Sequence, residues 1–261
     1  MAVSGAWADD AVGGCSVLPN QAALKAALTA AVATETSGLN NHLWGTIVDR
    51  DGVVCAVAFS GASRTGQFPG GRVTSETRAN TANALSLDST SNSGGSGQPV
   101  GFALSTANLY SAVQPGGSLF GLEFSNPVDT NAAYGGPAAL FGTAADPMVG
   151  RKIGGVAVLG GGFALFDKNH KIVGGVGVSG DTACGDHNVG WRVRHGLGLD
   201  HMAAGTLPAV AGVSGDPMRP DNIVFDITPN PNGGTGISAG GFGHPLCLNA
   251  SGSSTLPPVI P

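Results

Sequence analysis

One short segment limits the fold more than any other: the run 171–178, which has the sequence KIVGGVGV. Its β-branched residues predict a strand. Its glycines, at positions 174, 175 and 177, imply that another backbone packs closely against it, because glycine has no Cβ to hold a neighbour away. Together with the apolar stretch 154–166 and the turn 167–170, the run predicts an antiparallel hairpin.

The composition excludes several classes of protein. Among 261 residues there are 44 glycines and 16 prolines, but only 12 basic and 17 acidic residues. The net charge of −5 argues against a nucleic-acid surface, which needs clustered Lys and Arg. No uninterrupted apolar run reaches about 18 residues, so the sequence predicts no membrane span. Apolar residues make up 42%, which excludes wholesale disorder and predicts a soluble, loop-rich globular protein.

The remaining segments form an alternation of helices and hairpins. Asn20 precedes an Ala- and Leu-rich stretch typical of a capped amphipathic helix. The pattern predicts helices over 21–35, 75–88, 105–113 and 187–199, strands over 43–48, 53–59 and 223–227, an ordered loop over 118–150 and a surface tail over 228–261. Hairpins pair antiparallel, so we expect an α+β fold, an antiparallel sheet with helices packed on one face, in a single domain spanning 1–261.

The four cysteines are at 15, 55, 184 and 247, and no two have C-x-x-C spacing, so neither a zinc ribbon nor a redox motif is predicted. Cys55 lies in the apolar run 53–59, which predicts a buried free thiol. The other three lie in loop-like sequence. Two of them could pair in an oxidising compartment, and all could stay reduced elsewhere.

The most polar segment after an apolar strand is 180–188, GDTACGDHN. It leads into the expected helix 187–199, whose first N–H groups would be available to an anion such as a carboxylate. The alternative is structural: Asp186 caps the helix, and His187 is a surface residue of its first turn. The sequence contains no phosphate-binding loop, no dinucleotide fingerprint and no G-x-S-x-G elbow.

Five short segments stand in order along the chain: DRDG (49–52), TRANTA (77–82), LST (104–106), IGGV (153–156) and KIVGGVGVSGD (171–181). Together they resemble the GlcG/HbpS-like heme-binding family and the similar C-terminal domain of PduO-type proteins. The resemblance covers about 20–200, and its most specific part is the second hairpin. The chain departs from the family in a long insertion (about 89–150), in the segment 184–187 and in its added tail, and so looks like a longer, exported subfamily.

The resemblance implies an antiparallel sheet with flanking helices, a ring-like homo-oligomer and heme as the small-molecule ligand, for sequestration or sensing. Thr81 matches a threonine implicated in heme contact in the family; the alternative, which its position favours, is a helix-interior residue that packs on the sheet. We expect the ligand between the exit of the second hairpin and the next helix, contacted by His187, Asp186 and Asp181. Either His187 or His201 could ligate the iron.

Two other functions remain open. The protein could be an enzyme acting on a small acidic metabolite, with His187 as general base paired to Asp186 or Asp181. It could also be a structural oligomer with a vestigial pocket. Residues 1–14 show no signal peptide, but the resemblance favours a periplasmic or secreted protein. In that case we expect Cys184 to pair with Cys247 or Cys15, and Cys55 to stay reduced.

Overall fold

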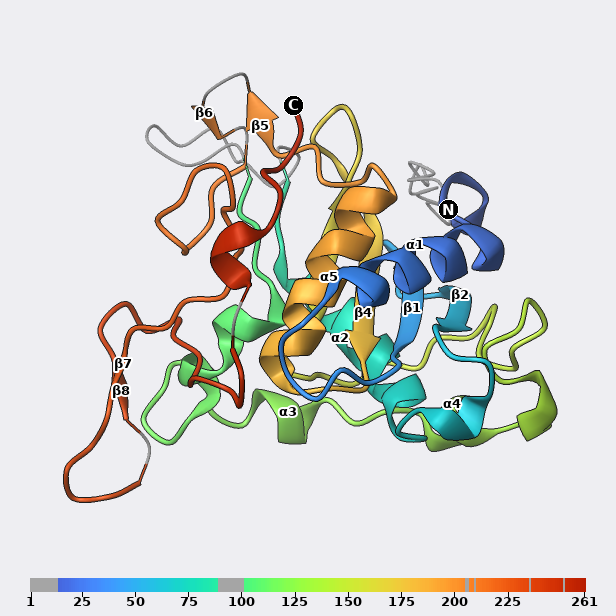
Figure 1. Cartoon of the computed structure of the whole chain (residues 1–261), viewed down its shortest axis with the longest axis horizontal. Helices are drawn as coiled ribbons and strands as arrows, with labels where there is room; N and C mark the ends of the chain where they lie inside the picture. Colours follow the sequence, from blue (N-terminus) through green and yellow to red (C-terminus); the bar gives the residue numbers. More distant parts are fainter. Residues whose placement is uncertain (1–13, 89–100, 205–206, 209, 235, 251) are drawn as a thin grey trace, which may run out of the picture.

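The centre of the fold is a four-stranded antiparallel sheet (Figure 1). We analysed a computed structural model, which describes residues 14–88, 101–204, 207–208, 210–234, 236–250 and 252–261. The strands run in the order β2-β1-β4-β3, and every neighbouring pair is antiparallel. Their bounds are β1 Trp44–Asp49, β2 Val54–Phe59, β3 Gly162–Phe166 and β4 Ile172–Ser179. The expected α+β class with an antiparallel sheet is confirmed.

Helix α2 (Gly71–Leu85) lies across one face of the sheet, mainly on β4. The glycines of β4 make this approach close. A Cβ on Gly175 would lie against the backbone oxygen of Ala79, and one on Gly177 against that of Ser75, both well inside van der Waals contact. The close backbone approach expected from the glycine run is therefore confirmed, and the approaching element is α2.

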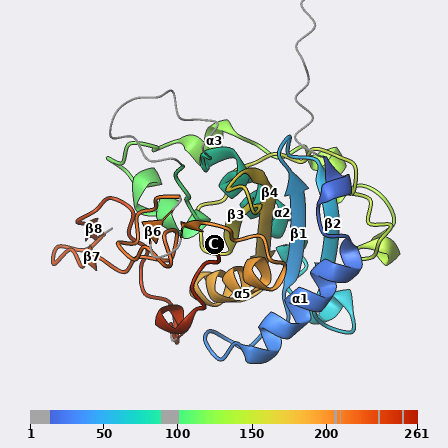
Figure 2. The same ribbon diagram turned by 90° about the horizontal axis from the view of Figure 1, so that it is seen from above.

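Helices α1 (Gln21–Thr34) and α5 (Ala183–Gly196) lie side by side on the opposite face, as Figure 2 shows. The side chains of β1 alternate between the layers: Thr46 hydrogen-bonds to Ser75 of α2, whereas Ile47 packs with Leu28 of α1. The helices thus cover both faces of the sheet, where one face was expected. The reason is that β1 and β4 are apolar at successive positions and expose two faces that must be buried.

Several helix boundaries differ from the sequence-based expectations. Helix α2 begins at Gly71, four residues before the expected start, because the hydroxyls of Thr74 and Ser75 bond back to carbonyls in the preceding turn and cap nothing. Helix α5 begins at Ala183 and is capped by Thr182, because the carboxylate of Asp186 is taken by another partner, described below. The expected helix 105–113 is a pair of 3₁₀ turns, Thr106–Leu109 and Ser111–Val113.

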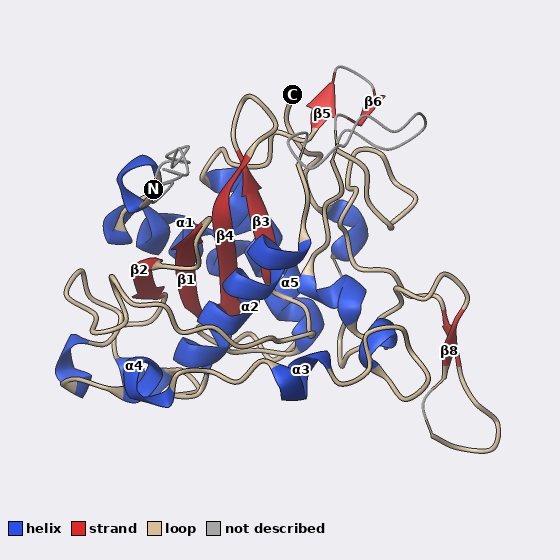
Figure 3. Cartoon of the chain, turned by 180° about the vertical axis from the view of Figure 1, so that it is seen from behind, coloured by secondary structure: helices blue, strands red, loops and turns tan. Residues whose placement is uncertain are grey.

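One expected strand is shorter than predicted, and the strand expected over 223–227 does not form. The stretch 154–161 is irregular because Gly154, Gly155 and Gly161 have positive φ angles, so only Gly162–Phe166 forms a strand. The expected strand 223–227 is replaced by a small projecting hairpin, β7 (Ile227–Thr228) with β8 (Ile237–Ser238), seen in Figure 3. The remaining elements are α3 Leu122–Ser125, α4 Thr130–Tyr134, β5 Ala203–Ala204, β6 Leu207–Pro208 and the 3₁₀ turns Cys15–Val17, Arg64–Gly66, Ala138–Leu140 and Ser253–Thr255.

The stretch 118–150, expected to be an ordered loop, contributes to the core. Ala132, Ala133 and Met148 pack with residues of α2, β1 and β2. Arg72 of α2 and Asp146 form a buried ion pair, with 2.9 Å between Arg72 Nε and Asp146 Oδ2. Since neither partner is left unpaired, the pair fastens this segment to the sheet layer. The first part of the predicted insertion, 89–100, lies outside the described residues.

The C-terminal segment from residue 210 onwards, called the tail below, contacts α5 at several points along the helix. Cys184 and Cys247 form a disulfide, Trp191 Nε1 donates to Pro257 O at 2.9 Å, and Val259 lies in the core. The tail is thus partly core, not the surface wrap that its composition predicted. The expectation of a reduced Cys55 is wrong, because Cys55 pairs with Cys15.

The pairing of Cys184 with Cys247 agrees with one of the two alternatives expected for an exported chain. Two disulfides are compatible with an extracellular location, because such bonds persist in oxidising compartments. Among the described residues, no helix has the length and apolar character needed to cross a membrane.

Candidate functional site

The exit of β4 is shaped by Gly180 and Asp181. Gly180 has φ +153°, and a Cβ there would meet the backbone oxygen of His42 at 2.7 Å. The carboxylate of Asp181 accepts N–H groups from Leu39 and Asn41, each at 2.8 Å. Asp181 therefore fastens the loop after α1 to this turn, and its carboxylate oxygens are both engaged. A cavity of about 10 Å³ beside it is large enough for no more than one water molecule.

Asp186 is fully buried in the first turn of α5. Arg78 Nη1 donates to its Oδ2 at 2.5 Å and to Val178 O at 2.6 Å, and the Asp181 backbone N–H donates to its Oδ1 at 2.8 Å. Burial raises the pKa of Asp186 to about 6, and the charge of Arg78 opposes that shift. This carboxylate joins α2, β4 and α5 and is directed into the protein.

His187 is also fully buried, under the tail. Its Nε2 lies 3.1 Å from both Asn222 Oδ1 and the Ile223 backbone nitrogen, and its ring packs 4.8 Å from that of Phe163. Burial lowers the pKa of His187 to about 3, so the ring is neutral at physiological pH. A general base needs to reach a substrate proton, and the folded tail separates this ring from solvent.

The other two expected site residues lie elsewhere. Thr81, on the α2 face of the sheet, donates its hydroxyl to Thr77 O at 2.6 Å and accepts the Ala157 N–H at 3.0 Å. His201 follows α5, and its Nδ1 hydrogen-bonds to Pro261 O. The ten residues from His187 to the end of α5 at Gly196 span about 14 Å of helix, and His201 lies beyond that end. The structure thus joins Asp186 to Asp181 through the Asp181 backbone N–H. The side chains of His187, Thr81 and His201 each hydrogen-bond to other partners.

The start of α5 is occupied by groups of the protein. Thr182 accepts the Gly185 N–H at 3.2 Å, and Cys247 Sγ lies 3.1 Å from the Cys184 nitrogen, which donates to it. The anion position expected there is therefore filled by a side-chain hydroxyl and a disulfide sulfur. Sequence reasoning could not foresee this, because the tail residue that covers the helix start lies 63 positions further along the chain.

A surface groove between α1 and α5 offers more room. It encloses about 600 Å³ and is open to solvent on one side. Its floor is nearly all alkyl, and its one charged residue is Arg192, whose Nη1 pairs with Glu35. The lining residues are Pro19, Ala23, Ala26, Ala27, Ala30, Ala31, Thr34, Arg192, Gly196 and Leu197.

His195 precedes the lining residue Gly196 in α5 and is not itself one of the residues that line the groove. Its Nδ1 lies 2.8 Å from Asp200 Oδ2, and its side chain is 34% exposed. A carboxylate on one ring nitrogen fixes the orientation of the imidazole, as in many metal-binding histidines. The sequence analysis missed this pair, although the two residues are only five positions apart.

Glu76 is a second residue that sequence reasoning missed. It is the one acidic residue of α2, is fully buried, and neither of its carboxyl oxygens has a hydrogen-bond partner among the described residues. Burial raises its pKa to about 8. The sequence gives no periodic signal for this burial, because eleven of the fifteen residues of α2 are buried.

Comparison with known proteins leaves the family open. No family model matches the sequence, and no curated protein matches it. Among solved structures, the chain is similar to the Klebsiella pneumoniae protein ORFY, described as DUF336, with 22% identity and a TM-score of 0.42 over 69% of this chain and 90% of that one. It is also similar to PduOC in a heme complex, with 19% identity and a TM-score of 0.43 over 67% and 89%. The chain's own sheet and helices define its fold class.

Proposed function

We propose that the protein binds heme in the groove between α1 and α5. The observation that carries the proposal is the chemical match between ligand and groove. Heme is a flat apolar macrocycle with two carboxylates, and the groove combines an alanine-rich floor with one guanidinium. Its volume of about 600 Å³ falls within the rough range of 300–1,000 Å³ for small-molecule sites.

Arg192 is suited to hold a propionate. Its hydrogen bonds to described residues, to Glu35 and to Asn188 O, all use Nη1, which leaves Nη2 and Nε with donor capacity for a second carboxylate. His195 would supply an imidazole to the iron, with Asp200 holding the other ring nitrogen. Bound heme would supply its usual chemistry, reversible ligand binding and redox change at iron, in a site open to solvent.

The same ligand fits poorly at the site predicted from sequence. His187 is covered by Asn222 and Ile223, and the tail that carries them is joined to α5 by a disulfide. Entry of heme there would require this tail to detach. The alternative activity with His187 as general base meets the same obstacle, and no separate observation favours it.

Hemin titration of the apoprotein, followed by the Soret absorbance, tests the proposal. Ala26→Trp fills the groove and should weaken binding at least about tenfold. Ala22→Trp, on the exposed side of α1 outside the groove, is the matched control and should bind as the wild type does. Arg192→Gln should also weaken binding, and His195→Ala should move the Soret band, because an iron ligand is lost.

The variants His187→Ala and Thr81→Val separate the groove from the site predicted from sequence, and both should titrate normally. No Soret shift in the wild-type protein would refute heme binding altogether. Loss of binding in His187→Ala with normal binding in Ala26→Trp would refute the groove and place the ligand at the start of α5.

We also infer that the chain assembles into a homo-oligomer and is exported. Large apolar side chains are exposed on α3, on β8 and on the loop that follows β8, and such surface favours burial in an interface. Multi-angle light scattering at micromolar concentration should report a mass that is a multiple of 25.7 kDa, and a monomer would contradict the inference. The most exposed of these side chains are Phe124, Leu246, Ile237 and Leu248.

A further inference from the structure

The disulfide at the start of α5 has a histidine beside it. Cys184 lies in the first turn of α5, and Cys247 and His244 lie in the tail. The two sulfurs and one ring nitrogen of His244 all lie within 4.8 Å of one another. Cys184 and His244 are each 2% exposed, whereas Cys247 is half-buried and gives a reductant a route to the bond.

The ring of His244 is in the state that binds metal ions. Its Nδ1 lies 2.7 Å from Pro245 O, and a carbonyl oxygen can only accept, so Nδ1 carries the proton and Nε2 has a lone pair. Nε2 is buried and has no hydrogen-bond partner among the described residues. Burial also lowers the pKa of His244, which keeps the ring neutral. A buried acceptor without a donor is costly, and a bound cation would relieve that cost.

We propose that reduction of the Cys184–Cys247 disulfide creates a binding site for a zinc-class divalent cation, with the two thiolates and His244 as ligands. Two sulfurs and one imidazole are a ligand set that zinc accepts, with water in the fourth position. The metal would replace the covalent link between α5 and the tail by a coordinate one. This site lies apart from the α1–α5 groove and does not depend on heme binding.

The chemistry balances with a thiol-class or phosphine-class reductant. A dithiol attacks one sulfur, its second thiol releases the mixed disulfide, and the products are two cysteine thiols and a cyclic disulfide of the reductant. Two electrons pass from the dithiol to the protein disulfide. Binding of the cation then displaces the two thiol protons, so each metal ion bound releases two protons to solvent.

The second disulfide provides an internal comparison. Cys15 and Cys55 lie near the carboxylate of Asp49. Oδ1 of Asp49 accepts the N–H groups of Asp51 and Val53, at 3.0 and 2.9 Å, so it is engaged in the turn between β1 and β2. This pair lacks an imidazole, and we assign no metal site to it.

The experiment uses the full chain with Cys15→Ser and Cys55→Ser, which leaves one cysteine pair. The protein is reduced with a trialkylphosphine, which is oxidised to its oxide with oxygen from water, and is desalted without air. Titration with Co²⁺ should show one ion per chain with thiolate-to-cobalt charge-transfer absorption, and Zn²⁺ should displace it. The oxidised protein should show no such band.

His244→Gln in the same background should weaken Co²⁺ binding at least about tenfold, because even the loss of a supporting residue around a metal commonly costs that much. The matched control is His42→Gln, at an exposed histidine, which should bind normally. Equal affinity in the two variants, or no charge-transfer band after reduction, would overturn the proposal. If reduction unfolds the chain, Zn²⁺ should restore the helical circular dichroism signal with His244 present and not in His244→Gln; no restoration would count against the site.

Discussion

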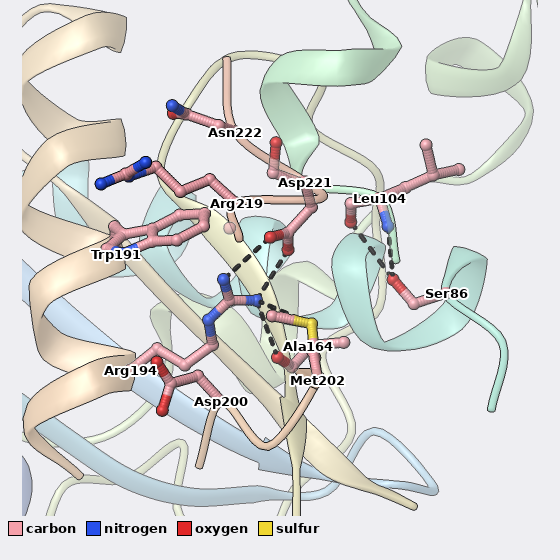
Figure 4. A network of polar contacts seen from close by, with 12 residues as sticks. Ser86, Leu104, Ala164, Trp191, Arg194, Asp200, Met202, Arg219, Asp221 and Asn222 are labelled. Atoms are coloured by element: carbon pink, nitrogen blue, oxygen red, sulfur yellow. Dashed lines mark hydrogen bonds and ion pairs between the residues drawn. The ribbon is translucent and has the colours of Figure 1, made fainter. Parts of the chain in front are cut away.

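Arg194 of α5 and Asp221 of the tail form a fully buried, two-bond ion pair (Figure 4). Arg194 Nη1 donates to Asp221 Oδ2 at 2.6 Å, and Nη2 donates to Oδ1 at 2.8 Å. The guanidinium carbon lies 4.7 Å from the ring centres of both Phe163 and Trp191. The pair fixes the tail residues next to it, including Asn222, over His187. The burial of His187 thus depends on a contact between distant parts of the sequence.

Asp221→Asn should destabilise the protein by about 3–5 kcal/mol, because it leaves the guanidinium of Arg194 buried without a counter-charge. Asp216→Asn removes the charge from the half-buried Asp216–Arg219 pair, where water still reaches both groups, and should cost less than about 1 kcal/mol. Urea unfolding of the three proteins measures both values.

A double variant sharpens this test. Arg194→Met with Asp221→Leu removes both charges at once, and it should be more stable than Asp221→Asn because no unpaired charge remains. If Asp221→Asn costs no more than Asp216→Asn, the buried pair does not hold the tail.

Gly175→Ala should destabilise the protein severely, because its methyl group would lie against the Ala79 backbone oxygen and push α2 off the sheet. Gly70→Ala is the matched control. Gly70 has φ −65° and ψ −22°, and a Cβ there would have no neighbour within 4 Å. That substitution should be neutral or slightly stabilising. Thermal unfolding of both variants checks the contrast, and an unchanged melting temperature in Gly175→Ala would contradict the close packing.

The glycine run of β4 was informative because it reports on its own positions: where another backbone packs directly on a strand, there is no room for a side chain at that position. The two hairpin patterns likewise predicted the antiparallel pairing of β1 with β2 and of β3 with β4. Neither feature predicted on how many faces the helices lie, because burial of both faces depends on where α1 and α5 pack after the chain has folded.

The candidate site was less predictable for the same reason. The segment 180–188 is polar in sequence, and nothing nearby indicates that Asp186 meets Arg78 or that His187 is covered by Asn222. These partners lie 108 and 35 positions away. Cys55 was predicted to be reduced from its apolar surroundings, but its pairing depends on Cys15, which approaches β2 only in the folded chain.

Thiol titration of the unfolded, unreduced protein should find no free thiol, because all four cysteines are paired. The sequence alone predicted two. In the chain-entropy treatment, loops closed over 40 and 63 residues each contribute about 4 kcal/mol, so the double variants Cys15→Ser/Cys55→Ser and Cys184→Ser/Cys247→Ser should be destabilised to a similar extent. Two free thiols in the titration would show that one of the pairs does not form.

Glu76 should make stability depend on pH in a direction opposite to that of an ordinary carboxylate. Its folded pKa, about 8, lies above its ordinary value of 4.5. The folded chain therefore holds the proton more tightly than the unfolded chain does, and the resulting stabilisation is complete below about pH 4.5 and is lost as the pH rises towards 8.

Glu76→Gln cannot ionise, so comparison with the wild type isolates this effect. Between pH 4.5 and 8, the free energy of unfolding of the wild type should fall relative to that of the variant, by up to about 1.4 kcal/mol per pH unit. Below and above that window, the difference between the two proteins should be constant. Glu123→Gln, at an exposed position, is the matched control and should show a much smaller pH dependence. Urea unfolding at intervals across this pH range measures the difference. If the difference between Glu76→Gln and the wild type stays flat from pH 4 to 9, Glu76 ionises normally and has a partner or water that the fold described here does not provide.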